Sequence, residues 1–77
     1  MPYFDFLDPL LWDLDDINKW LCWIQREFIL PQIPNKSLFP DNGENLCKLT
    51  FQDFLNIVSA KETAKVLYQN LNHLKRG

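Results

Sequence analysis

The 77-residue sequence has only two glycines, Gly43 and Gly77, one histidine, His73, and two cysteines, Cys22 and Cys47. Two isolated glycines cannot build a glycine-rich phosphate-binding loop. The cysteines have no zinc-ligand spacing with each other or with His73, and they can form at most one disulfide. We therefore expect reduced intracellular thiols, no bound metal and no cofactor.

Candidate catalytic groups are equally scarce. His73 lies near the end of the last expected helix on a polar side, which is typical of a surface residue rather than of a general base. Asp15 and Asp16 are adjacent carboxylates, but the start of a helix explains them better. The cysteines lack a histidine partner in the local sequence. We expect that the protein is not an enzyme.

No apolar run is long enough to span a bilayer, and the acidic start is unlike a signal or transit peptide, so we expect a soluble protein without a membrane partner.

The net charge of −2 does not indicate the densely basic surface that binds nucleic acid. Residues 1–16 hold five aspartates and no cation, whereas residues 61–77 hold four cations against Glu62 alone. This polarity indicates either head-to-tail association or the complementing of helix dipoles.

Aromatic side chains are abundant, with six Phe, three Trp and two Tyr. A chain of this length is near the lower limit for a core without metal or disulfide, and large aromatic residues help to meet that limit. The strongest helical signal covers residues 13–28, with Asp13 as N-cap and Pro31 ending the helix near Phe28 or Ile29. Its core-facing stripe is expected to contain Ile17, Trp20, Leu21, Ile24 and Phe28.

Trp23 lies off this stripe, so another segment should cover it. Residues 1–12 are rich in apolar side chains and predict a short helix or extended arm that packs back over Trp23; the alternative is an exposed partner-binding strip. Residues 29–40 carry three prolines and predict a loop with one helical turn around Ser37 to Phe39. Its apolar residues should fill the core: Ile33, Leu38 and Phe39.

Three further helices are expected. Asn42 can cap a short helix over residues 44–48, with Leu46 and Leu49 inward, and the pair Thr50 and Asp53 forms a capping box for a helix ending near Val58. A second box, Ser59 with Glu62, precedes a long helix over residues 60–75. Its inward stripe is Ala64, Leu67, Leu71 and Leu74, and Val66 should point away from it and be exposed. Without alternating strand patterns, the fold class is all-α with four to six helices.

Three segments together resemble the Pointed domain of ETS-family transcription factors, a branch of the sterile alpha motif (SAM) fold. They are DINKWLCWIQREF from Asp16, NGENLCKLTFQDFL from Asn42 and VLYQNLNHL from Val66, preceded by Trp12. The resemblance covers residues 10–76. It implies a five-helix bundle with an extra N-terminal helix or arm over residues 1–11 and the Pointed domain proper over residues 12–77.

By this resemblance, the chain is a protein-interaction domain of a nuclear transcriptional regulator. DNA would be read only by a separate ETS domain. Some members of the family associate head to tail, with a mid-loop surface on one domain meeting the start of the last helix of the next. The resemblance places the end-helix surface at Ser59, Lys61, Glu62, Lys65 and Val66, and the mid-loop surface at Asn45, Lys48 and Asp53.

Val66 matches the family pattern at the centre of this contact, but Asn45 departs from it, since polymer-forming members carry a small apolar residue there. Burying an unpaired Asn side chain would cost roughly 1–3 kcal/mol and could reduce a polymer to a dimer or abolish it. Another branch of the family docks a MAP kinase. The corresponding positions are Leu55 and Ile57, which match in character, and Lys61, which does not, so a monomeric docking platform for a MAP kinase or coactivator is the alternative.

Overall fold

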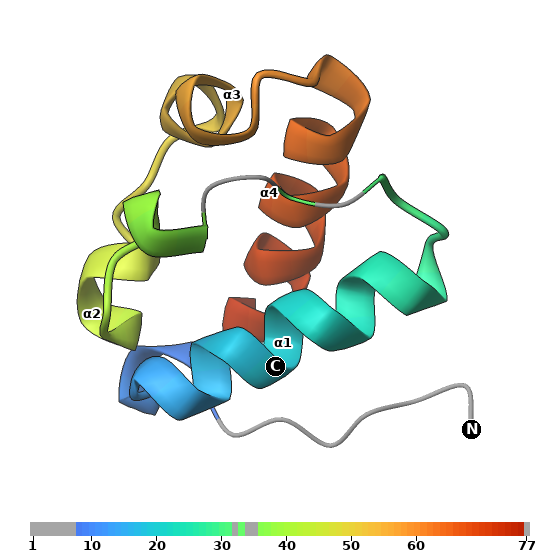
Figure 1. Cartoon of the computed structure of the whole chain (residues 1–77). Coiled ribbons are helices and arrows are strands. Elements are labelled where there is room, and N and C mark those ends of the chain that lie inside the picture. Colours follow the sequence, from blue (N-terminus) through green and yellow to red (C-terminus); the bar gives the residue numbers. More distant parts are fainter. Residues whose placement is uncertain (1–7, 32, 34–35, 77) are drawn as a thin grey trace.

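The computed structural model describes residues 8–31, 33 and 36–76, and for Arg76 the backbone only. These residues form four α-helices and two 3₁₀-helices and contain no strand, as the all-α prediction requires. In chain order the elements are η1 (Pro9–Leu11), α1 (Leu14–Glu27), η2 (Lys36–Leu38), α2 (Gly43–Leu46), α3 (Phe51–Val58) and α4 (Lys61–Arg76) (Figure 1).

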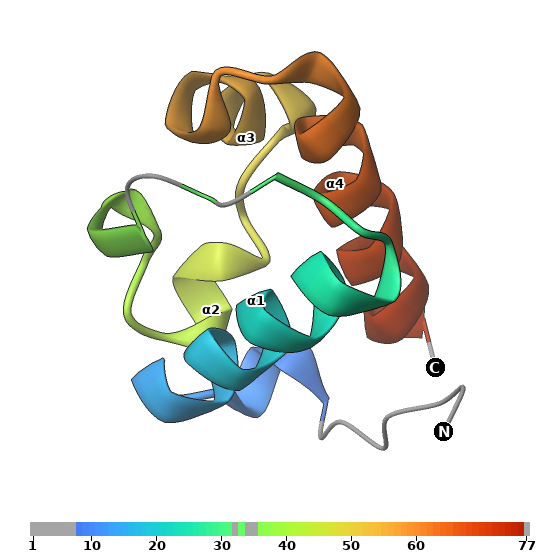
Figure 2. The same cartoon turned by 45° about the vertical axis from the view of Figure 1, so that its right-hand side comes forward.

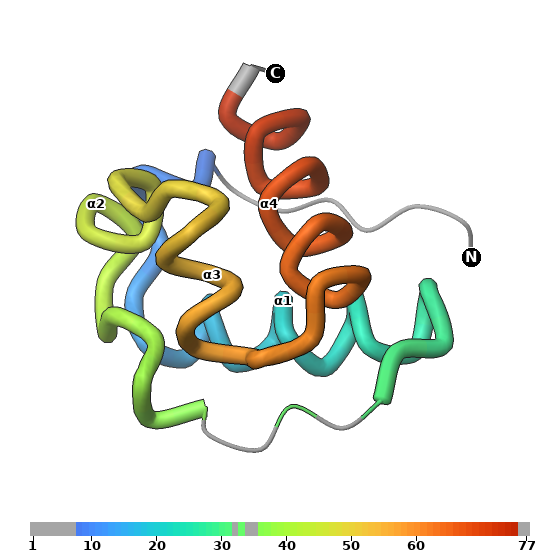
Figure 3. Tube along the Cα trace, turned by 90° about the horizontal axis from the view of Figure 1, so that it is seen from above, coloured from blue at the N-terminus to red at the C-terminus, as the bar shows by residue number. Residues whose placement is uncertain are grey.

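The two long helices, α1 and α4, carry most of the core, and the short elements pack around them. α3 packs against α4, alongside its first turns (Figures 1 and 3). α2 packs against η1 at the other end of the bundle, near the last turns of α4 (Figure 2). Because α4 has 16 residues, it spans about 24 Å and connects these two ends.

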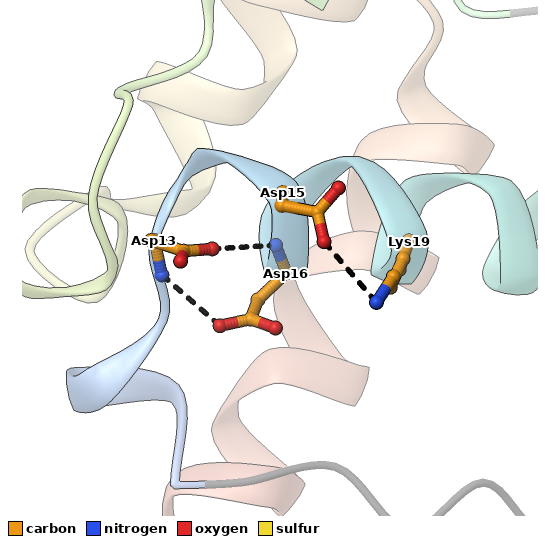
Figure 4. A network of polar contacts seen from close by, with 4 residues as sticks. All are labelled: Asp13, Asp15, Asp16 and Lys19. Atoms are coloured by element: carbon orange, nitrogen blue, oxygen red, sulfur yellow. Dashed lines mark hydrogen bonds and ion pairs between the residues drawn. The ribbon is translucent and has the colours of Figure 1, made fainter.

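Three predicted helix starts are confirmed. Asp13 caps α1, and it forms a reciprocal capping box with Asp16, whose N–H donates to the Asp13 carboxylate at 2.9 Å (Figure 4). This bond holds the pKa of the Asp13 carboxyl below its usual value, because it stabilises the charged form. Asn42 caps α2, which ends at Leu46, and Thr50 with Asp53 forms the expected box on α3.

The predicted box of Ser59 and Glu62 is wrong. Ser59 instead ends α3, with a left-handed φ of 60° and its N–H donated to the Leu55 carbonyl. The first carbonyl of α4 to accept a helical bond belongs to Ala60, so the helix starts one residue after Ala60 rather than at it. The connection between α3 and α4 is too short for Ser59 to cap both helices.

The predicted core stripes are largely confirmed. Ile17, Trp20, Leu21 and Ile24 of α1 are buried, as are Ala64, Leu67 and Leu71 of α4, and Leu74 is partly buried. Two members of the predicted core are exposed instead: Phe28 and Leu38. Phe28 leaves the stripe because α1 ends at Glu27 and Phe28 is its C-cap. In the loop before α2, Ile33 and Phe39 are buried as expected, while Leu38 ends η2 and faces solvent.

α2 is held against η1 by a close backbone contact. The Gly43 N–H donates to the Trp12 carbonyl at 2.8 Å. A Cβ at position 43 would lie 1.7 Å from the Pro9 carbonyl oxygen, so only glycine fits here. At the C-terminal end of α2, the Lys75 ammonium of α4 donates to the Cys47 carbonyl at 3.2 Å. This bond ties the last turn of α4 to the end of α2.

The expected N-terminal arm is described only in part. Residues 1–7 lie outside the described residues, and residues 9–11 form η1, capped by Asp8, whose carboxylate accepts the Leu10 N–H. Pro9 and Trp12 are buried, with the Trp12 ring centroid 5.5 Å from that of Trp20. Trp23 is half-buried and packs against the core, and the cover predicted for it from residues 1–12 falls mainly outside the described residues.

α1 ends in a strained turn at Ile29. This residue has a φ of 52°, and the next N–H, of Leu30, donates to the Gln25 carbonyl in the six-to-one bond of a Schellman motif. The left-handed position of such a motif usually holds glycine, because a Cβ costs about 1–2 kcal/mol there and a β-branched residue fits poorly. The Ile29 side chain is 90% exposed, so it gains little burial in return.

We expect Ile29→Gly to raise the free energy of unfolding by about 0.5–1 kcal/mol, because relief of strain exceeds the entropy that glycine adds to the unfolded chain. Urea denaturation of the two proteins measures the difference. Ile29→Val keeps the β-branched strain and should be neutral. A less stable Ile29→Gly protein would show that the side chain contributes packing.

Trp20 is fully buried, and its indole Nε1–H donates to Asn70 Oδ1 at 2.9 Å. We expect Asn70→Ala to lower the free energy of unfolding by about 1–3 kcal/mol, because it leaves a buried donor without its partner. Gln69→Ala, at the exposed neighbouring position, is the matched control and should have little effect. Equal losses in the two variants in thermal unfolding would contradict this interpretation of the Trp20 bond.

Candidate protein-interaction surfaces

The predicted end-helix surface lies at the corner between α3 and α4 and on the first turns of α4 (Figure 1). Its polar members, Ser59, Lys61, Glu62 and Lys65, are all exposed. Lys61 and Lys65 stand one helical turn apart, so they present two positive charges on one side of the helix against one negative charge from Glu62. The surface is therefore mildly cationic and accessible.

Val66 is half-buried and packs against the core, so the prediction of an exposed valine is wrong. The reason lies in two residues that share its face of α4, three positions before and four positions after it. Thr63 is buried, with 3% exposure, and Asn70 accepts the Trp20 bond. The buried stripe of α4 is thus wider than its leucines indicate, and Val66 lies at the edge of that stripe, beside the exposed lysines.

The predicted mid-loop surface consists of Asn45, Lys48 and Asp53. Asn45 and Lys48 are exposed, on α2 and in the turn that follows it. Asp53 is half-buried and belongs to the α3 capping box, where its carboxylate accepts the Thr50 N–H at 2.9 Å. Its acceptor capacity is therefore partly used within the chain. Asn45 and Lys48 are the members that remain free for a partner to approach.

The predicted kinase-docking residues, Leu55 and Ile57, lie on α3. Both are half-buried and pack against the core. Phe51 and Phe54 of the same helix contact the Tyr68 ring of α4 edge to face, with centroids 6.1 and 6.2 Å apart. These contacts fix α3 on α4 and leave only part of each predicted docking side chain accessible.

Sequence reasoning missed an open hollow on the outer side of α1. It has a volume of about 450 Å³, and a second hollow of about 440 Å³ shares Cys22 and Arg26 with it. Cys22 is exposed, with its Sγ 4.0 Å from the Lys36 ammonium. The only signal in the sequence was that Cys22 and Trp23 lie off the apolar stripe. The remaining lining residues are Asn18, Lys19, Trp23, Gln25 and Lys36.

A second apolar feature lies at the start of the described chain. Leu10, Leu11 and Leu14 are 54%, 72% and 52% exposed. They are half of the large exposed hydrophobic residues in the described part of the chain, and they fall within five consecutive positions. We call them the leucine cluster. Leu10 and Leu11 belong to the segment over residues 1–12 for which a covering arm and an exposed partner-binding strip were both predicted, and residues 1–7 of that segment lie outside the described residues.

The described residues contain no group of three or more His, Cys, Asp or Glu side chains that could hold a metal ion. Nor does any helix among them have the length and apolar character needed to cross a membrane. What the described surface offers is a set of exposed apolar and charged side chains on helix ends. Such an arrangement suits contact with another macromolecule.

Comparison with known proteins identifies the family. The family model of the sterile alpha motif (SAM)/Pointed domain matches residues 2–77. The chain belongs to the SAM/Pointed family. The resemblance to the Pointed domain of ETS-family transcription factors is thereby confirmed, and so is the helical bundle that it implied.

Three similar proteins illustrate the extent of the match. This Pointed domain is 41% identical over 69 residues to the retroviral integration site protein Fli-1 homolog of Xenopus laevis. It is 36% identical over 69 residues to the transcriptional regulator ERG of Homo sapiens and 37% identical over 68 residues to the transcription factor ETV6 of Homo sapiens. Each match covers 88% of this chain but only 14–15% of the relative, so the chain spans about a seventh of their length.

The two thiols should differ in reactivity. Cys22 is exposed, whereas Cys47 is half-buried and burial raises the pKa of its thiol. A raised pKa lowers the thiolate fraction at any given pH, and only the thiolate is the nucleophile.

We expect iodoacetamide to label Cys22 first at neutral pH, with the labelling of Cys47 increasing only at a pH above the usual thiol range. Mass spectrometry of the single-thiol variants Cys22→Ser and Cys47→Ser at several pH values measures both rates. Equal rates in folded protein would contradict the expectation.

Proposed function

We propose that this Pointed domain is a protein-interaction domain of an ETS-family transcriptional regulator and that it associates with a like or related SAM/Pointed domain through the end-helix surface. The observation that carries the proposal is the position of Val66 at the border between the core and an exposed cationic surface on the first turns of α4. An apolar side chain beside charged residues is the usual composition of a small interface centre with a polar rim.

The half-burial of Val66 limits what this contact can supply. Only the exposed part of the side chain is desolvated on binding, so the apolar gain is a fraction of the roughly 1.5–3 kcal/mol of a fully buried aliphatic residue. The lysines beside it must contribute by attracting an acidic partner surface. The proposed association is therefore modest in affinity and sensitive to salt.

The proposed cellular setting follows from the family. Two of the relatives are named as a transcriptional regulator and a transcription factor. We propose that the protein acts in the nucleus and that it reaches DNA through a separate ETS domain rather than through this domain. The support within the chain is its net charge of −2, which offers no extended basic surface for the phosphate backbone.

We expect Val66→Asp to leave the fold intact and to eliminate self-association, because a carboxylate buried at the contact would have no partner. Sedimentation equilibrium at increasing protein concentration measures the association, and thermal unfolding checks the fold. Since Val66 is half-buried, Val66→Ile serves as a second variant that should keep both the fold and the association.

Leu38→Asp is the matched control for the added charge, because Leu38 is 56% exposed and belongs to η2 rather than to α4. It should associate as the parent does. Unchanged association of a folded Val66→Asp protein would refute the end-helix surface. A parent protein that stays monomeric at every concentration would refute self-association.

A monomeric docking platform for a MAP kinase or coactivator is the alternative function. It would use Leu55 and Ile57 of α3, whose half-buried side chains leave only part of each available. The sedimentation experiment separates the two functions, because only the first predicts a mass that increases with concentration.

A further inference from the structure

The leucine cluster is surrounded by carboxylates. Asp8, Asp13 and Asp15 are exposed and Asp16 is half-buried, all within nine residues of chain that contain the cluster. The nearest cation in the sequence is Lys19, whose ammonium lies 3.1 Å from Asp15 Oδ2 (Figure 4). Residues 8–19 therefore carry four carboxylates and one ammonium and form an acidic rim, while Lys75 of α4 reaches the same end of the bundle at the Cys47 carbonyl. An apolar centre with an acidic rim should accept an apolar residue surrounded by cations.

The end-helix surface has that composition. Val66 supplies the apolar part, and Lys61 and Lys65 supply positive charge. The start of α4 and η1 lie at opposite ends of the bundle, so one molecule cannot bring the two surfaces together (Figures 1 and 2). A second copy of the chain can, and the resulting contact would be head to tail.

The leucine cluster also lies beside the mid-loop position that departs from the family pattern. Asn45 is on α2, and α2 is joined to η1 by the bond from Gly43 to the Trp12 carbonyl. A contact centred on Asn45 alone would place an amide against the valine of the next molecule. A contact shifted from α2 onto η1 would offer Leu10 and Leu11 instead, which are exposed and apolar.

We infer that the surface which receives Val66 of a second copy is the leucine cluster with its acidic rim, rather than the region around Asn45. This inference rests on the proposed self-association and assigns its acceptor surface. A stable interface buries about 800 Å² on each partner. Three half-exposed leucines supply only part of that area, so the polar rim must contribute and the contact is salt-sensitive.

The test uses Leu11→Lys, because Leu11 is the most exposed member of the cluster and caps no helix. We expect it to weaken self-association at least about tenfold, since it removes apolar contact and adds a charge that repels Lys61 and Lys65. Leu38→Lys places the same change on η2 and should have no effect. Sedimentation equilibrium of folded proteins measures both.

Mixing two variants tests whether the end-helix surface of one molecule meets the leucine cluster of the other. Leu11→Lys keeps the end-helix surface and Val66→Asp keeps the leucine cluster, so an equimolar mixture should form a dimer of twice 9.2 kDa that neither protein forms alone.

A charge exchange tests the acidic rim: Asp15→Lys and Lys65→Glu should each weaken self-association, and their mixture should regain it. Both positions are exposed, so the fold should persist.

Two outcomes separate the inference from the proposed function. If Val66→Asp abolishes association but Leu11→Lys and Asp15→Lys do not, the acceptor lies elsewhere and only this inference is overturned; loss of association in Asn45→Lys would then place it on the mid-loop surface. If Val66→Asp has no effect, or the parent is monomeric, the proposed function fails and the inference fails with it.

Discussion

The fold depends on the contact between α1 and α4 at Trp20. This side chain has no exposed area, its ring lies 5.5 Å from that of Trp12, and its only polar atom donates to Asn70. One residue thus joins η1, α1 and α4 through packing and a satisfied hydrogen bond. A chain of this size has only a small core, so this one contact largely fixes how η1, α1 and α4 are arranged. These elements carry the end-helix surface and the leucine cluster.

The same contact explains why the edge of α4 could not be deduced from its leucines. Periodicity identifies the residues that face one neighbouring helix, here Ala64, Leu67 and Leu71. It gives no warning that Thr63 is also buried or that Asn70 faces inward to accept the Trp20 bond. Val66, which shares their side of the helix, is drawn halfway into the core for this reason. The inward position of Asn70 depends on its partner Trp20, which lies 50 positions away in the sequence.

Local chemistry, by contrast, was readable from the sequence. The caps at Asp13, Asn42 and Thr50 are set by side chains within three residues of the backbone groups that they bind, so no tertiary knowledge was needed. The errors at helix ends occurred where two elements compete for one residue or where the chain reverses direction. Ser59 ends one helix instead of starting the next, and the left-handed turn at Ile29 lets Phe28 leave the stripe that its spacing predicted.

For the surfaces, the family resemblance predicted an end-helix surface, and an exposed strip was one of two interpretations of residues 1–12, but the sequence could not decide that Leu10, Leu11 and Leu14 are exposed. α4 has a further consequence for any assembly built from this domain. As a stiff rod of 16 residues, it keeps its first turns and the η1 end apart by a fixed span. Filling one end should leave the other geometrically unaltered. Successive additions would then proceed with equal affinity, and the mean length of a filament would be set by the protein concentration relative to the dissociation constant of one contact, without a nucleation threshold.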